Sequence, residues 1–123
     1  MFLRRCCIAL IVFFFGLLAI PTPVTAEEMN WTLTSKHQYK VQFKLYSNDR
    51  NHVWPSASTA WDLDDYASHT VHINCITGER ICYGAWQTGN SNIYWGGGYG
   101  NRQHCDNCCA VCGDGDVDKT LLR

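Results

Sequence analysis

A cluster of four cysteines near the end of the chain restricts what this sequence can fold into. The cluster forms two abutting Cys-x-x-Cys pairs within eight residues, and two further cysteines precede it. In chain order these six residues are Cys75, Cys82, Cys105, Cys108, Cys109 and Cys112. Reducing compartments favour metal binding by such a cluster, whereas oxidising compartments favour disulfides. The compartment to which the chain is sent therefore decides how the cysteines are interpreted.

Residues 1–26 have the pattern of a secretory signal peptide. Arg4 and Arg5 form a positively charged start, an apolar run follows, and Ala26 ends a stretch suited to signal peptidase. The apolar run is shorter than the roughly 20 residues that a membrane-spanning helix needs. We therefore expect cleavage before Glu27 and export to the periplasm or the extracellular space. An uncleaved membrane anchor is the alternative.

The chain that remains after cleavage, 27–123, has the length of one small domain. We expect an ordered core over about 30–113 and a loose tail over 114–123, because short polar chain ends are seldom tied down. No second apolar run of spanning length occurs in 27–123, so no membrane contact is expected after cleavage.

The charge pattern argues against a nucleic-acid partner. The whole chain has a formal net charge of −1, and loss of Arg4 and Arg5 makes it more negative by two. Binding to phosphate backbones needs clustered Lys and Arg, and no basic patch stands out in the sequence.

Alternation of apolar and polar residues predicts several β-strands. The clearest is 39–45, where rings and branched side chains alternate with Lys and Gln. Segments 70–76 and 81–86 are expected to form a hairpin around Gly78, and 30–34 a short preceding strand. The predicted fold is mostly β: a small disulfide-rich domain with an antiparallel hairpin or meander core and a Cys-rich C-terminal knot.

The expected hairpin places Cys75 directly opposite Cys82. A bond between them would be strained, because Cβ atoms in such a pair lie about 5.5 Å apart and disulfides prefer about 3.8 Å. Bonds from Cys75 and Cys82 to two members of the cluster would close longer loops, worth roughly 3.5 kcal/mol each against roughly 2 for short loops. We favour the long connections, with the direct bond as the alternative.

A stretch rich in Gly, Asn and rings is the most binding-like part of the chain. Flat rings stack on sugar faces, and amides reach sugar hydroxyls. The candidate ligand-binding residues are Asn90, Asn92, Tyr94, Trp95 and Tyr99. The alternative is that these rings fill the core, as rings often do in small domains. The hairpin register assigns Trp86 to the core.

The sequence gives little support for catalysis or for metal binding. The carboxylates Asp62, Asp64, Asp65 and Glu79 have no partner in a catalytic motif, and Glu79 is expected at a turn tip. We therefore name no catalytic residue. The two Cys-x-x-Cys pairs have zinc-like spacing, but they abut, which makes it hard for four sulfurs to surround one ion. No metal ligand and no cofactor is predicted.

These features together predict an exported, disulfide-stabilised domain that binds a glycan or another protein at the cell envelope or outside the cell. This role is non-enzymatic. A small secreted hydrolase and a Cys-based metal-binding protein are the rival interpretations.

Overall fold

The computed structural model describes residue 16 and residues 24–122. Most of the predicted signal peptide lies outside the described residues, so its cleavage stays a prediction. The described part contains nine strands and one short 3₁₀ helix. The bounds are β1 Ala26–Ser35, β2 Val41–Ser47, β3 Val53–Trp54, β4 Trp61–Leu63, β5 Ser68–Ile76, β6 Arg80–Gln87, β7 Asn90–Gly96, η1 Tyr99–Asn101, β8 Cys109–Val111 and β9 Val117–Leu121. Among these residues no helix is both long and apolar enough to cross a membrane.

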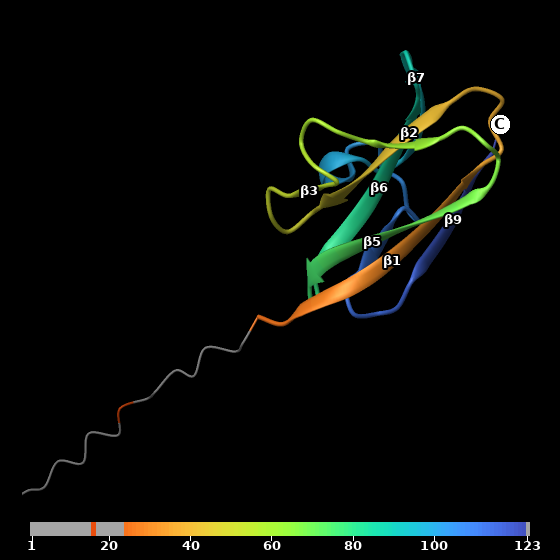
Figure 1. Cartoon of the computed structure of the whole chain (residues 1–123). Helices are drawn as coiled ribbons and strands as arrows, with labels where there is room; N and C mark the ends of the chain where they lie inside the picture. Colours follow the sequence, from red (N-terminus) through yellow and green to blue (C-terminus); the bar gives the residue numbers. More distant parts are fainter. Residues whose placement is uncertain (1–15, 17–23, 123) are drawn as a thin grey trace, which may run out of the picture.

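The strands form two sheets, so the mostly-β prediction is confirmed (Figure 1). The first sheet has the order β5-β1-β9. The second has the order β3-β2-β6-β7, with β4 paired to β2 and β8 paired to β6. Buried side chains of both sheets contribute to one hydrophobic core. The sheets therefore pack face to face as a small sandwich.

Alternation along β1, the central strand of its sheet, shows which of its two faces is buried. Met29, Trp31 and Leu33 are at most 2 % exposed and face the second sheet. Alternate residues point to opposite faces of a strand, so Asn30 and Thr32 lie on the outer face. The predicted short strand 30–34 is thus part of a longer one.

Strand β2 confirms the clearest sequence prediction. Val41, Phe43 and Leu45 are fully buried and alternate with partly exposed residues. Tyr39 is the exception, because it precedes the strand and is 58 % exposed. The period of two therefore located this buried face correctly.

The predicted hairpin between 70–76 and 81–86 is wrong. β5 pairs with β1 over nine residues, from Ala26 opposite Ile76 to Thr34 opposite Ser68. β6 has β2 along one edge and β7 and β8 along the other, which leaves no edge for β5. The turn at 77–78 therefore carries the chain from one sheet to the other.

The cysteines pair as the long-loop interpretation predicted. Cys75 bonds to Cys112 and Cys82 bonds to Cys109, with sequence separations of 37 and 27. The remaining bond joins Cys105 to Cys108. Cys82 and Cys109 are opposed residues of the β6–β8 ladder. Two cysteines of the cluster, Cys109 and Cys112, thus attach the C-terminal segment to both sheets, and the other two bond to each other.

The loose tail expected over 114–123 is a wrong prediction for its described part, 114–122. Val117–Leu121 forms β9, which pairs in parallel with β1. Leu121 is 1 % exposed, and its carbonyl accepts a hydrogen bond of 2.8 Å from the Lys36 amide. The ordered domain therefore extends beyond 30–113 at both ends, because each end supplies a strand to the same sheet.

We expect Leu121→Ala to destabilise the protein by about 2–4 kcal/mol, since it would leave a cavity in a packed core. Leu122→Ala is the matched control, because the Leu122 side chain is 68 % exposed. Urea unfolding of both variants measures the difference. Equal, small effects would mean that the C-terminal strand contributes nothing to the core.

The disulfides should differ in their contribution to stability. Replacing Cys75 and Cys112 by Ala should lower the free energy of unfolding by about 4 kcal/mol, and replacing Cys105 and Cys108 by about 2, because loop entropy grows with the residues enclosed. Urea unfolding of the two double variants under oxidising conditions tests this order. A larger loss from the Cys105–Cys108 pair would contradict it.

Candidate functional site

A cleft of about 570 Å³ opens between the edge of β5 and the chain that passes through β3 to β4. This volume falls in the roughly 300–1,000 Å³ range of small-molecule sites. Its lining residues are Ala26, Arg50, His52, Trp54, Pro55, Trp61, His72, Ile73, Asn74, Cys75 and Ile76. They come from both sheets, so only the packed sandwich creates the cleft.

Apolar side chains form the inner part of the cleft. Trp54, Ile73 and Cys75 are at most 7 % exposed. Trp61 is partly buried and packs on Phe43, with ring centroids 5.1 Å apart. A ligand with an apolar face would therefore meet ring and aliphatic surface on entering.

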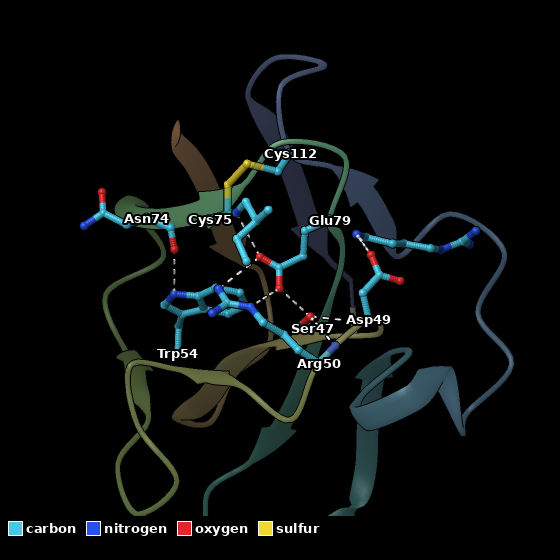
Figure 2. A network of polar contacts seen from close by, with 10 residues as sticks. Ser47, Asp49, Arg50, Trp54, Asn74, Cys75, Glu79 and Cys112 are labelled. Atoms are coloured by element: carbon cyan, nitrogen blue, oxygen red, sulfur yellow. Dashed lines mark hydrogen bonds and ion pairs between the residues drawn. A yellow bond between two sulfur atoms is a disulfide. The ribbon is translucent and has the colours of Figure 1, made fainter. Parts of the chain in front are cut away.

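Three neighbours hold Trp54 in place, and Figure 2 shows two of them, Asn74 and Arg50. Its indole Nε1 donates to the backbone carbonyl of Asn74 at 3.2 Å, which joins β3 to the edge of β5. The His52 ring meets it edge-on at 4.6 Å, and the Arg50 guanidinium lies 5.6 Å from its centroid. A cation over an indole face is attracted by the ring quadrupole. The indole is therefore a rigid element of the cleft wall.

Arg50 is itself fixed by a buried carboxylate. Nε and Nη2 of Arg50 both donate to Glu79, whose side chain is 2 % exposed. Glu79 also accepts from the Ser47 hydroxyl at 2.6 Å and from the Ile76 amide at 3.1 Å (Figure 2). The sequence placed Glu79 at a turn tip without a partner, and the structure corrects this interpretation.

The hydrogen bonds decide the charge state of Glu79. Burial by itself would raise the pKa of this carboxyl, but the hydrogen bonds from Arg50, Ser47 and Ile76 and the charge of Arg50 outweigh it, so the pKa lies below its ordinary value. Glu79 is therefore an anion at neutral pH. It anchors Arg50 from behind and does not line the cleft.

Polar groups form the rim of the cleft. Arg50, His52, His72 and Asn74 are exposed residues that supply guanidinium, imidazole and amide groups. The Nδ1 atom of His72 is hydrogen-bonded to the side chain of Asn30 in the adjacent strand β1. No Asp or Glu occurs among the described residues that line the cleft. The site thus combines an apolar interior with hydrogen-bonding groups at its mouth.

The residues predicted to bind ligand lie elsewhere, on β7 and η1. Asn90 and Asn92 are exposed at the start of β7, where Asn90 Oδ1 accepts from the Asn92 amide at 3.2 Å. Tyr99 is 41 % exposed, and the Arg102 guanidinium lies 5.3 Å from its ring. The structure does not bring these three residues into the cleft, and their binding role stays a prediction.

The two tryptophans lie on the opposite sides from those expected. The sequence analysis assigned Trp86 to the core and Trp95 to a binding surface. Trp95 faces the core, packs 5.1 Å from the His37 ring and donates to the Leu122 carbonyl at 3.0 Å. Trp86 lies on the outer face of the second sheet, stacked on Tyr94 at 6.5 Å. The wrong hairpin caused the error at Trp86, because it assigned the core to the wrong face of β6.

Tyr94 is wedged into that outer face. A Cβ atom at Gly84 would collide with the Tyr94 hydroxyl, so the glycine makes room for the phenol. Burial is the main cause of a raised pKa for Tyr94, with smaller contributions from Tyr46 and Tyr83. The Tyr94 phenol is therefore neutral at physiological pH and serves chiefly in packing.

Sequence reasoning missed the cleft because its residues are scattered. Arg50, His52 and Trp54 belong to a segment that reads only as a polar turn followed by Trp-Pro. Their partners on β5 are about 20 residues away along the chain. The sole local signal was a Trp and a Pro next to a turn, which is too common to indicate a site.

No protein-family model, curated protein or solved structure matches the chain. The function must therefore be argued from the site itself.

The Glu79 network should make the protein sensitive to acid. A lowered folded-state pKa contributes stability that is present above the ordinary value of 4.5 and is lost as the pH falls below it. Glu79→Gln should cost about 2–4 kcal/mol at pH 7, because a buried hydrogen-bonded ion pair is broken. Between pH 5 and 3, the free energy of unfolding should fall less in the Glu79→Gln variant than in the unmodified protein.

Urea unfolding across this pH range measures both effects. Glu28→Gln, a change at an exposed carboxylate of β1, is the control and should leave the profile unchanged. A Glu79→Gln profile parallel to that of the unmodified protein would contradict the role given to this carboxylate.

Proposed function

We propose that this protein is an exported, disulfide-stabilised domain that binds carbohydrate in the Trp54 cleft, at the cell envelope or outside the cell. The observation that carries the proposal is the cleft itself, with an apolar interior of Trp54, Trp61 and Ile73 beneath a polar rim. A sugar ring has one apolar face and a periphery of hydroxyls. Both features of the cleft complement it.

Export is supported by the cysteine chemistry. Three disulfides join the cysteines of the described residues, and such bonds persist in oxidising compartments. The signal-peptide pattern of residues 1–26 points the same way. A small domain outside the cell gains from covalent crosslinks, because its core alone contributes little net stability.

A sugar fits the cleft better than an extended peptide does. Peptides commonly bind a sheet edge by adding a strand to it. Here Trp54 already occupies the Asn74 carbonyl, and Glu79 occupies both the amide and the carbonyl of Ile76. The end of the β5 edge is therefore closed to a new strand at the Asn74 carbonyl and at Ile76.

Binding is also better supported than hydrolysis. Most glycoside hydrolases use a pair of carboxylic acids on either side of the scissile bond. The described lining of the cleft contains no Asp or Glu, and the nearby Glu79 is fully engaged with Arg50, Ser47 and Ile76. The residues present can hold a sugar, but they offer no acid–base pair.

A glycan array probed with the exported, oxidised chain tests the proposal. Trp61→Ala should weaken binding of any glycan detected, because the ring supplies apolar surface in the cleft. His52→Ala, which changes an exposed rim residue, should weaken binding with no loss of fold. Thermal unfolding of each variant separates loss of binding from loss of structure.

Tyr99→Ala is the matched control. Tyr99 is an exposed ring on the β7–η1 surface, which the sequence predicted to bind ligand and which lies outside the cleft. It should leave binding unchanged. Loss of binding in Tyr99→Ala but not in the cleft variants would move the site to the β7–η1 surface. An array with no bound glycan would overturn the proposal.

A further inference from the structure

We infer that the Trp54 cleft selects acidic carbohydrate, meaning a sugar that carries a carboxylate, over neutral carbohydrate. This inference rests on the proposed function, since it names the class of ligand for the same site. It is carried by the distribution of charge around the cleft, which differs from that of the chain as a whole.

The ionisable side chains that line the cleft among the described residues are all basic. Arg50, His52 and His72 stand at its rim, and none of the acidic residues of the described part lines it. The whole chain nevertheless has 11 acidic against 10 basic residues. The absence of carboxylates here is thus a local property of the site. A carboxylate bound in the cleft would therefore meet basic side chains in the lining, with the Glu79 anion placed behind Arg50.

Arg50 has an N–H group, at Nη1, that can donate a hydrogen bond to a ligand. Its Nε and Nη2 atoms donate to Glu79, and no hydrogen bond within the described residues uses Nη1. A guanidinium has five N–H groups and stays charged at all physiological pH values. Because Arg50 lines the cleft and Glu79 does not, a bound carboxylate would meet the guanidinium and not the buried anion behind it.

The position of Arg50 is set before any ligand arrives. Its guanidinium lies between the Glu79 carboxylate and the Trp54 ring, 5.6 Å from the ring centroid. A preorganised donor loses less conformational entropy on binding than a free surface arginine does. The ion pair with Glu79 therefore orients Arg50 toward the ligand in addition to stabilising the fold.

The two histidines complete the polar side of the site. His52 is exposed and rests edge-on against Trp54, and its backbone is fixed by hydrogen bonds to Ser47 and Arg50. His72 is oriented by Asn30 through Nδ1, so its Nε2 edge is the one available to a ligand. A uronic acid could thus place its ring against Trp61 and Pro55 with its carboxylate toward Arg50.

Calorimetric titration with a matched pair of ligands tests the inference. Oligogalacturonate and its methyl ester have the same rings, but only the first carries carboxylates. We expect the acid to bind at least about tenfold more tightly, because hydrogen bonds between charged groups are the stronger ones. The preference should decrease as salt is added, since exposed charges are screened.

A paired substitution tests the part played by Arg50. Arg50→Met alone would leave Glu79 buried without its partner, so it is combined with Glu79→Gln, which keeps an acceptor for Ser47 and Ile76. The double variant should bind acid and ester equally. Trp61→Ala, by contrast, should weaken both ligands by similar factors and retain the preference.

The outcomes separate this inference from the proposed function. Equal binding of acid and ester by the unmodified protein, or an array that retains only neutral glycans, would overturn the selectivity and leave carbohydrate binding intact. Failure to bind any glycan, acidic or neutral, would overturn both. An acid preference that survives in the Arg50→Met/Glu79→Gln variant would show that Arg50 does not determine it.

Discussion

The buried carboxylate of Glu79 is the interaction on which much of this structure depends. Glu79 lies where the chain leaves the first sheet for the second. Its side chain accepts hydrogen bonds from Ser47 at the end of β2, from Arg50 in the following turn and from the Ile76 amide at the end of β5. Its backbone carbonyl accepts from Cys112 at 2.8 Å. One residue thus joins both sheets and the C-terminal segment.

The cleft is a consequence of this junction. Because Arg50 is anchored by Glu79, its guanidinium stays over Trp54, and Trp54 in turn covers the edge of β5 through Asn74. The Cys75–Cys112 bond lies beside the same junction and holds β5 against the C-terminal segment (Figure 2). Fold stability and the shape of the site therefore rest on the same few contacts. A residue that appears purely structural, Glu79, also orients a group that would contact ligand.

Sequence patterns correctly predicted a buried strand face and the type of disulfide connection. The alternation in β2 identified a buried face, and the cysteine spacing together with loop entropy favoured the long disulfides. The hairpin failed because strand pairing is a competition among all strands, and β1 was the better partner for β5. The assignment of Trp86 to the core failed with it, since reversing the face of one strand reverses every side chain on it.

The sequence by itself determined that the chain would be a small β domain crosslinked through its C-terminal cysteines, because side-chain period and cysteine number are local properties. Only the tertiary structure decided that the last residues form β9, that both edges of β6 are occupied, and that Arg50, Trp54 and His72 meet in one cleft. The physical reason is that these contacts join residues far apart in the chain. Their free energy exists only once both sheets have packed.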